Sequence, residues 1–229
     1  DMIVVQGTVV TARHSSKSLK GLVFADLIKN LDVPVLVGNT VSYEVTKELM
    51  QQGIAGVMVG VGPGSVCTSR EVLGIGIPQV SATIECAAAR DDYFKETGKY
   101  IPIITDGGIR TGGDVCKSFA AGANAVMIGS PFAKTEEAPA KGFHWGMAAW
   151  HDSLPRGTRI NMGTEYSLNQ LLYGPSSRTD GTLNLVGALQ ICMGYVGAEN
   201  IREMNKARMV YAPAIKTEGK MYQQAGLGS

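Results

Sequence analysis

The sequence lacks long runs of one charge and carries almost no net charge. Its 21 Lys and Arg residues are balanced by 20 Asp and Glu residues, which leaves a net charge of +1. Because binding to nucleic acids or membrane surfaces relies on clustered positive charge, we expect neither kind of partner. No apolar run reaches the roughly 20 residues of a membrane span, and no signal-peptide pattern opens the sequence. We therefore expect a cytoplasmic protein.

Cysteine is scarce, and its spacing excludes common metal sites. The chain has 4 cysteines, none in a C-x-x-C pair, so we do not expect a zinc site. With 45% hydrophobic residues the chain has enough apolar surface for a core without disulfides. Glycine, by contrast, is abundant at 29 residues and stands at the ends of apolar runs. This placement is typical of an α/β protein that binds a phosphate-bearing ligand.

Short apolar runs rich in β-branched residues alternate with helical patterns. The expected strands are Met2–Val5, Val33–Val37, Gly56–Val59, Ile101–Thr105 and Ala125–Ile128. The expected helices are Tyr43–Gln52, Ala82–Glu96 and Asp114–Ala121, each followed directly by glycine or with one residue between. This alternation predicts βαβ units and a parallel sheet.

Glycine-rich polar segments follow the last two expected strands. They are Asp106-Gly107-Gly108 and Gly129-Ser130. Barrels of the (β/α)8 type bind phosphate in the loops after their last two strands. We therefore predict an α/β protein of the (β/α)8 TIM barrel class. A complete barrel needs about 250 residues, so this chain is expected to cover about strands four to eight. The alternative is an open, doubly wound sheet of five strands.

The expected domain organisation is the C-terminal part of a single catalytic barrel domain over residues 1–229. It has βα units at 1–138, a flap or insertion at 139–182, and final helices and a tail at 183–229. The stretch 139–173 has no clear period and is too long for a simple connector. We assign its His144 and His151 to packing or the surface. Two further helical patterns cover Leu183–Gly194 and Ala198–Ala207.

The segment from Val59 to Arg70 offers the strongest candidate for chemistry. Three glycines there precede Ser65 and Cys67. Nearby backbone N–H groups and Arg70 would favour a thiolate, which makes Cys67 a candidate nucleophile. The alternative is a buried loop cysteine that acts as a small apolar side chain, and the pattern alone leaves both open. The other three cysteines lie inside helical patterns and are expected to be structural.

This segment resembles the catalytic-cysteine loop of the IMP dehydrogenase/GMP reductase family. The similarity continues through Thr105–Arg110, Met127–Ser130 and Glu136–Pro139, and is nearest to members without inserted CBS domains. The resemblance implies a purine-nucleotide oxidoreductase, in which Cys67 attacks C2 of a purine nucleoside monophosphate and a hydride moves to or from NAD or NADPH. The leading expectation is an IMP dehydrogenase, which converts IMP to XMP.

Three alternatives stay open. A GMP reductase would convert GMP to IMP and ammonia with NADPH. A non-catalytic nucleotide-binding protein would keep only the phosphate loops, and another barrel enzyme would use those loops for a different phosphorylated ligand. The presence of Cys67 argues against the last two, because binding alone does not need a thiol.

The resemblance also implies roles for individual residues. Asp106 would bind the ribose hydroxyls, and Met162-Gly163 would contact the base. A 5′-phosphate would be bound by Ser65, Gly107, Gly108, Gly129 and Ser130. Cofactor contacts would come from Asn39 and Gly60, and a potassium ion would be bound at Gly62, Gly64 and Cys67, with Glu218-Gly219 of a neighbouring copy. A homo-oligomer, either a tetramer or an octamer, is implied. Each segment also has an alternative without a ligand: Asp106-Gly107-Gly108 could form a simple turn, and Gly129-Ser130 could cap the N-terminus of a helix.

Two departures from the family pattern affect the reaction. Val5-Gln6-Gly7 stands where the family has an Asp-x-Ser-x-Gly cofactor motif. No Arg-Tyr pair of the kind that activates water in the dehydrogenases precedes Leu183. The reductases use a Thr-Glu pair, whereas here Thr68 and Ser69 follow Cys67. The remaining candidates for water or ammonia chemistry are Glu165 and Arg178, with charged loop residues as the alternative.

Overall fold

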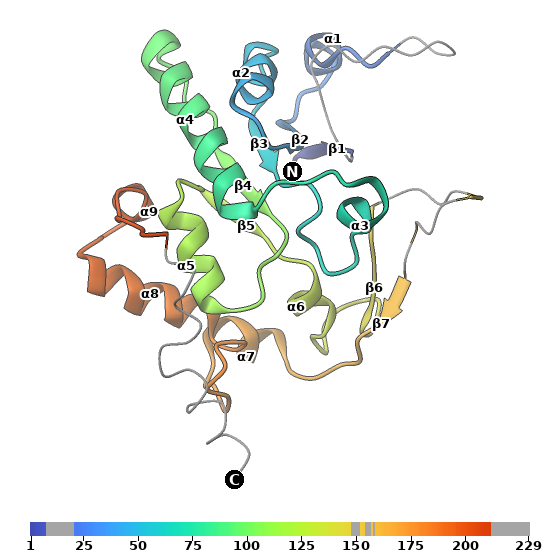
Figure 1. Ribbon diagram of the computed structural model, residues 1–229, viewed down its shortest axis with the longest axis vertical. Helices are drawn as coiled ribbons and strands as arrows, with labels where there is room; N and C mark the ends of the chain where they lie inside the picture. Colours follow the sequence, from blue (N-terminus) through green and yellow to red (C-terminus); the bar gives the residue numbers. More distant parts are fainter. Residues whose placement is uncertain (8–20, 148–151, 154–156, 158, 212–229) are drawn as a thin grey trace.

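A five-stranded parallel sheet forms the centre of the computed structural model, which describes residues 1–7, 21–147, 152–153, 157 and 159–211 (Figure 1). Its strands are β1 (Ile3–Gln6), β2 (Val35–Thr40), β3 (Gly56–Val59), β4 (Ile103–Asp106) and β5 (Ala125–Met127). All five expected strands are present. Because every strand pairs in parallel with the next one in the chain, the spatial order is β1-β2-β3-β4-β5.

This sequential order decides between the two sheet architectures. Connections between parallel strands are nearly always right-handed, so an unreversed order puts all the connecting helices on one face. They are α1 (Phe24–Lys29), α2 (Tyr43–Gln51), α4 (Gln79–Thr97) and α5 (Gly112–Ala120). A doubly wound sheet would reverse its strand order and carry helices on both faces. The chain therefore forms part of a (β/α)8 barrel, as the sequence predicts.

The first hydrophobic core lies between this face of the sheet and helices α1, α2 and α4. Val37 and Val57 are fully buried and pack against Leu49 and Met50 of α2 and Cys86 of α4. These strand residues alternate with ones that point to the other face, as the two-residue period of a strand requires. Burial of such apolar side chains fixes the register of the strands and hence the positions of their carboxyl ends.

A second core joins α5 to the C-terminal helices. These are α7 (Leu168–Tyr173), α8 (Leu185–Val196) and α9 (Ile201–Met204). Phe119 of α5 packs there with Leu171 and Met204. A Cβ atom on Gly112 would overlap the Cβ of Ala188, so the glycine lets α5 and α8 approach closely. The expected helix at Ala198–Ala207 is shorter than predicted.

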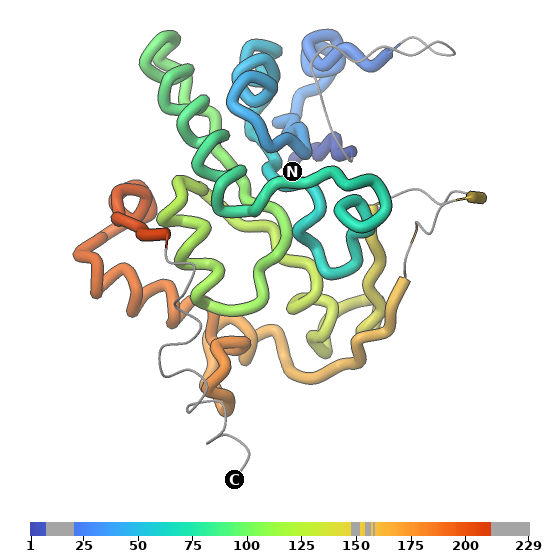
Figure 2. Tube along the Cα trace, viewed as in Figure 1, coloured from blue at the N-terminus to red at the C-terminus, as the bar shows by residue number. Residues whose placement is uncertain are grey.

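Several short elements were not predicted. The region 139–182 contains strand β6 (Phe143–Trp145), which pairs antiparallel with β7 (Arg159–Asn161). The two strands lie side by side in the yellow and orange part of the tube in Figure 2. Short helices α3 (Ser69–Leu73) and α6 (Ser130–Ala133) also follow strands β3 and β5. Elements of three to five residues are too short to show a period in the sequence. None of the described helices has the length and apolarity needed to cross a membrane.

Candidate active site

A cavity of about 280 Å³ opens where the carboxyl ends of the strands meet. This is the end of a parallel barrel at which ligands bind. Its volume lies near the lower limit of the roughly 300–1,000 Å³ of small-molecule sites. The lining comes from the carboxyl ends of the five strands or the loops after them, and from β6 and the residues that follow it: Gln6, Gly7, Asn39, Gly60–Cys67, Ser69, Asp106–Arg110, Met127, Gly129, Ser130 and His144–Met147.

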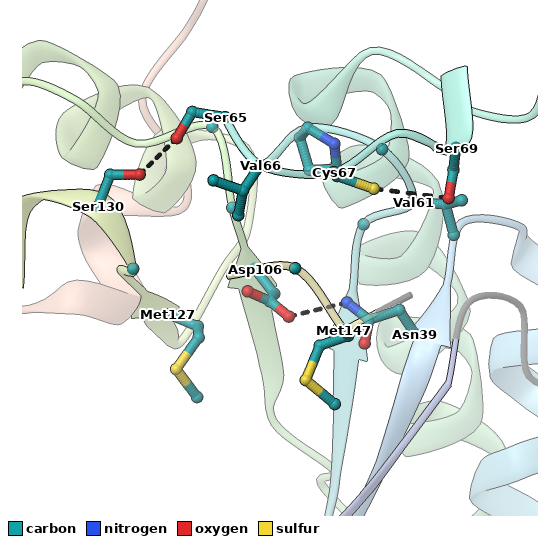
Figure 3. Close-up of a pocket in the computed structure, with 18 of the residues that line it drawn as sticks. Asn39, Val61, Ser65, Val66, Cys67, Ser69, Asp106, Met127, Ser130 and Met147 are labelled. Carbon is teal, nitrogen blue, oxygen red and sulfur yellow. Dashed lines mark hydrogen bonds between the residues drawn. The ribbon is translucent and has the colours of Figure 1, made fainter. Parts of the chain in front are cut away.

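The loop after β3 brings the Cys67 thiol into this cavity. The backbone amide of Cys67 donates to the Gly64 carbonyl at 3.0 Å and closes a turn. The half-buried thiol then lies 3.5 Å from the hydroxyl of Ser69, to which it donates (Figure 3). Thr68 is not among the lining residues, and its hydroxyl is buried without a hydrogen-bond partner in the described part of the chain.

Arg70 supports this loop from outside the cavity. Its guanidinium donates to the Ile77 carbonyl at 2.7 Å, and its side chain packs against Gly62. It does not line the cavity, so the expected help from Arg70 to the thiolate has no support in its position. Gly60 is required for packing: a Cβ there would lie 2.5 Å from the Asp106 carbonyl oxygen and 2.6 Å from the Gln79 side chain.

Two side-chain amides hold the Asp106 carboxylate at the end of β4. Gln6 Nε2 donates to Asp106 Oδ2 at 2.6 Å. Asn39 Nδ2 donates to the same oxygen at 2.9 Å (Figure 3). Gln6 also donates to Asn39 Oδ1 at 2.8 Å. Burial raises the pKa of Asp106, and the two amide bonds offset part of this effect. Among the described residues no hydrogen bond reaches Asp106 Oδ1, which leaves this oxygen for a ligand.

Hydroxyl and imidazole groups gather on the other side of the cavity. The hydroxyls of Ser65 and Ser130 are hydrogen-bonded to each other, and Ser130 Oγ lies 3.0 Å from His144 Nδ1. The neighbouring Gly107 and Gly108 both have a positive φ, which turns the backbone after β4 toward Pro63 and Gly64. His144 thus belongs to the cavity, whereas the sequence analysis assigned it to packing or the surface; the hairpin β6–β7 places it there.

The structure does not bring every candidate residue to the cavity. Glu165 accepts from Lys134 Nζ at 2.6 Å and from Arg178 Nη1 at 3.1 Å. Lys134 first, and Arg178 second, hold the pKa of Glu165 below its ordinary value. Neither Glu165 nor Arg178 lines the cavity, so their position gives no support for water or ammonia chemistry.

The expected base contact also lies elsewhere. Met162 and Gly163 do not line the cavity; the Met162 amide donates to the Gly142 carbonyl at 2.8 Å. A different pair, Gly146-Met147, lines it instead. Sequence reasoning missed this pair because the divergent stretch after residue 139 contains two Met residues beside a glycine.

The cation site expected at Gly62, Gly64 and Cys67 would rely on backbone carbonyl groups. The Gly64 carbonyl already accepts the Cys67 amide, and the positively charged Arg70 side chain packs against Gly62. Potassium binding at this loop therefore stays a prediction and enters no step below. Glu218-Gly219, His151 and most of the tail lie outside the described residues. No group of three or more His, Cys, Asp or Glu side chains in the described part is arranged to bind a metal ion.

Comparison with known proteins gives a family and several relatives. Residues 1–153 match the family model described as the IMP dehydrogenase / GMP reductase domain. An uncharacterized oxidoreductase of Mycolicibacterium smegmatis is 42% identical over 210 residues, which cover 90% of this chain and 56% of that protein. The inosine-5′-monophosphate dehydrogenase of Aquifex aeolicus is 39% identical over 227 residues, which cover 92% of this chain and 44% of that protein.

A solved structure is similar over nearly the whole chain. It is the crystal structure of an IMP dehydrogenase/GMP reductase-like protein from Corynebacterium glutamicum, with a TM-score of 0.83 and 36% sequence identity. The similarity covers 93% of this chain and 55% of that one. The chain thus spans about half the length of the relatives that it matches.

Proposed function

Because the chain belongs to the IMP dehydrogenase/GMP reductase family, we propose that it carries the Cys67-dependent redox chemistry of a purine nucleoside 5′-monophosphate. One observation carries the proposal. The half-buried Cys67 thiol, the Asp106 carboxylate and the hydroxyl pair Ser65–Ser130 all line one cavity of about 280 Å³. A nucleophile, an acceptor for sugar hydroxyls and a set of donors for a phosphate are what such a substrate requires.

The positions of these groups orient the proposed substrate. Asp106 Oδ1 accepts hydrogen bonds from the ribose hydroxyls, while Gln6 and Asn39 hold Oδ2. The Ser65 and Ser130 hydroxyls, with the backbone N–H groups of Gly108 and Gly129, bind the 5′-phosphate. The Gly107 N–H donates to the Met127 carbonyl at 3.2 Å, so Gly107 contributes by turning the backbone and not as a donor. The base then lies between the Cys67 loop and Gly146-Met147, which both line the cavity.

The chemistry is covalent catalysis at C2 of the purine. The Cys67 thiol loses its proton, and a carbon–sulfur bond forms at C2. In the dehydrogenase direction C2 loses a hydride, and water then hydrolyses the remaining thioimidate to XMP and frees the thiol. In the reductase direction the adduct loses ammonia, C2 accepts a hydride, and the carbon–sulfur bond breaks to give IMP. A bound nicotinamide supplies or accepts the hydride.

The dehydrogenase direction with IMP and NAD is our first candidate, supported by the Aquifex relative named as such an enzyme. The reductase direction, with GMP and NADPH, is favoured by a separate observation. Ser69 places a hydroxyl 3.5 Å from the Cys67 sulfur, and a hydroxyl near C2 suits transfer of a proton to a leaving amine. Arg178, a candidate for activating water in the dehydrogenase reaction, is bound to Glu165 and does not line the cavity, so its position does not support that direction.

The nicotinamide would lie beside the side-chain amides of Gln6 and Asn39, which line the same cavity. Both Gln6 N–H groups donate to Asp106 and Asn39, so Gln6 would offer its oxygen and Asn39 its second N–H to the carboxamide. Gln6 stands in place of the expected acidic residue, so these neutral groups would orient the nicotinamide ring without adding charge. Gly60 also lines the cavity, and the absence of a Cβ there lets β3 and β4 pack closely.

Parallel turnover assays test the proposal. The full chain is mixed with IMP plus NAD and with GMP plus NADPH, and nicotinamide absorbance is followed with time. We expect turnover in one mixture and its loss in Cys67→Ala, whereas Cys192→Ala, which changes a partly exposed thiol outside the cavity, stays active. Turnover that persists in Cys67→Ala would refute the nucleophile. Nucleotide binding without turnover in either mixture would favour the non-catalytic alternative.

Assembly is a further part of the proposal. A homo-oligomer, as a tetramer or an octamer, is expected from the family resemblance, and sedimentation of the purified chain tests it. Exposed apolar residues of α8 support association with further protein surface, since Ile191 is 64% and Tyr195 89% exposed.

A further inference from the structure

The phosphate side of the cavity is built mainly from uncharged donors. Of the described residues that line the cavity, only Arg110 and His144 can carry a positive charge. Arg110 is exposed and follows β4, and its backbone amide donates to Asp114 Oδ2 at 3.1 Å. His144 is the one in direct contact with the proposed phosphate-binding hydroxyls, through Ser130.

The imidazole of His144 is held in place from two sides. Its Nδ1 lies 3.0 Å from Ser130 Oγ, and Ser130 is in turn hydrogen-bonded to Ser65. The ring also lies against Gly129, because a Cβ on that glycine would be 3.0 Å from His144 Nε2 and 3.1 Å from Cε1. Two residues assigned to phosphate binding, Ser130 and Gly129, therefore lie against the ring, and Ser65 is joined to it through Ser130.

The hairpin places His144 and the Arg159 guanidinium on different faces. The neighbouring β6 residues, Phe143 and Trp145, lie under the Arg159 guanidinium at 4.3 Å and 5.9 Å from their ring centres. Successive side chains of a strand point to opposite faces, so His144 and Arg159 occupy different faces of the hairpin. His144 lines the cavity, whereas Arg159 does not.

The titratable groups around His144 are few. Helix α6, which packs against β6, contains Ser, Pro, Phe and Ala only, and the strand partner of His144 on β7 is Ile160. The cavity adds Cys67, Asp106 and Arg110. Burial of the ring lowers the pKa of His144, and no neighbouring charge among the described residues contributes to this shift. Without a ligand the imidazole is therefore mainly neutral at pH 7, and it stands where a dianionic group would be bound.

We propose that His144 binds the 5′-phosphate of the substrate and takes up a proton when the phosphate enters. The inference rests on the proposed function for the identity of the ligand, but concerns only its phosphate. While no phosphate is bound, a neutral imidazole avoids a partly buried, unpaired cation. The bound phosphate then supplies the opposite charge, and a charge-assisted hydrogen bond is about twice as strong as a neutral one.

The sign of the pH dependence follows from this coupling. A phosphate beside the ring raises the pKa of His144 in the complex above its value in the free protein. Between these two pKa values binding consumes a proton, so affinity falls as pH rises through this window. The second pKa of the phosphate itself, about 6, acts in the opposite direction, because a monoanion must lose a proton to bind as the dianion. Comparison with a variant that lacks the imidazole removes this second contribution.

Calorimetry tests the proposal directly. Binding of IMP, GMP and ribose 5-phosphate to the full chain is measured at pH 7 in two buffers with different ionisation enthalpies, which gives the number of protons taken up per ligand. The same titrations use His144→Gln, which keeps a hydrogen-bond partner for Ser130 but does not titrate. Arg110→Gln is the matched control, since it removes the other positive charge of the cavity lining.

We expect the wild-type chain and Arg110→Gln to take up more protons than His144→Gln with each phosphorylated ligand that binds. At pH 6.5 His144→Gln should bind about tenfold or more weakly than the wild type, and at pH 8.5 the difference should shrink. Dissociation constants of the wild type and His144→Gln, measured at pH 6.5 and at pH 8.5, give the ratio of affinities at each pH.

The outcomes separate this proposal from the proposed function. Proton uptake with ribose 5-phosphate but no purine chemistry at Cys67 would support the role of His144 and refute the nucleotide reaction. Turnover of a nucleotide with equal proton uptake in the wild type and His144→Gln would support the nucleotide reaction and refute the role of His144. If no phosphorylated ligand binds, the inference is overturned as well. Thermal unfolding of each variant shows whether a loss of binding comes from misfolding, and His144→Asn then serves as the second test.

Discussion

The Gln6 side chain donates to Asp106 Oδ2 at 2.6 Å and to Asn39 Oδ1 at 2.8 Å, so the ends of β1, β2 and β4 are joined by one cluster of hydrogen bonds. A neutral amide at residue 6 can donate to a carboxylate, whereas a second carboxylate there would repel it. The identity of residue 6 thus sets the charge next to the proposed ribose site.

Gln6→Glu should weaken nucleotide binding at neutral pH. Two carboxylates within hydrogen-bond distance cannot both ionise easily, so one of the two pKa values of the pair rises above that of an isolated carboxyl group. Below that raised pKa the shared proton replaces the lost amide donor, and affinity should recover as the pH falls. Isothermal titration from pH 5 to pH 8 measures this recovery. Gln6→Met, which removes the hydrogen bonds without adding charge, is the control; an equal, pH-independent loss in both variants would contradict the argument.

Asp106→Asn should reduce discrimination between ribose and deoxyribose. In the wild type, Oδ1 is free to accept hydroxyl hydrogen bonds, and bonds to an ionised acceptor contribute about 1.5–3 kcal/mol each. The asparagine accepts less strongly, so the ratio of dissociation constants for a 2′-deoxynucleotide and its ribonucleotide should fall about tenfold. An unchanged ratio would show that Asp106 does not bind the sugar.

The same residue makes a prediction about stability and pH. Burial raises the pKa of Asp106 in the folded chain above its value in the unfolded one. The stabilising contribution of the protonated form is therefore fully present below the unfolded pKa of about 3.9 and is lost as the pH rises through the folded pKa. Relative to wild type, Asp106→Asn should gain stability over this window. Urea unfolding at pH 4 and pH 7 measures the free energy of unfolding of both proteins. If the stability of Asp106→Asn relative to wild type falls between pH 4 and pH 7, the predicted direction is wrong.

Alkylation of the native chain should distinguish the cysteines. Burial raises the pKa of Cys86 to about 11, and burial together with the neighbouring Cys192 raises that of Cys116 to about 12. Because only the thiolate reacts, both should stay unmodified with iodoacetamide at pH 8. Cys67 lines the cavity and should react, with protection by the bound nucleotide. Mass spectrometry of the peptides gives the result, and labelling of Cys86 before Cys67 would contradict the assignment.

Two glycine variants test the contact between α5 and α8. Gly112→Ala should destabilise the fold by about 1–3 kcal/mol, because the new methyl group overlaps Ala188 in a packed interface. Gly194→Ala lies in α8 with no atom within 4 Å of the added Cβ and should stabilise by about 0.5–1 kcal/mol. Thermal unfolding compares the two. Equal effects would mean that the helices can separate without cost.

The centre of the sheet could be predicted because β2, β3 and β4 are buried on both faces. Residues such as Val57 and Val59 form unbroken apolar runs, and the glycine after each long helix marks its end. Asp106 could be found because it ends such a strand, and Cys67 and Ser130 because they lie in glycine-containing segments after strands. The choice between a barrel and a doubly wound sheet needed the strand order, which no local pattern contains.

The residues of the hairpin could not be predicted. His144 and Met147 reach the cavity only because β6 and β7 fold back over it, and three-residue strands leave no periodic signal. Glu165 and Arg178 were candidates because charged residues are the usual agents of proton transfer. The structure pairs them with each other, and a pairing across 13 residues of irregular chain depends on tertiary packing alone.

The sequential strand order has a consequence for substrate recognition. Neighbouring strands lie about 4.8 Å apart, so groups at the ends of successive strands are spaced regularly along the edge of the sheet. Cys67 lies after β3, Asp106 ends β4, and Ser130 lies after β5. On the proposed function these three residues contact the base, the sugar and the phosphate, which is the order in which a nucleotide is bonded. A ligand with the same three groups in another covalent order would not match this edge, whatever its affinity for any single group.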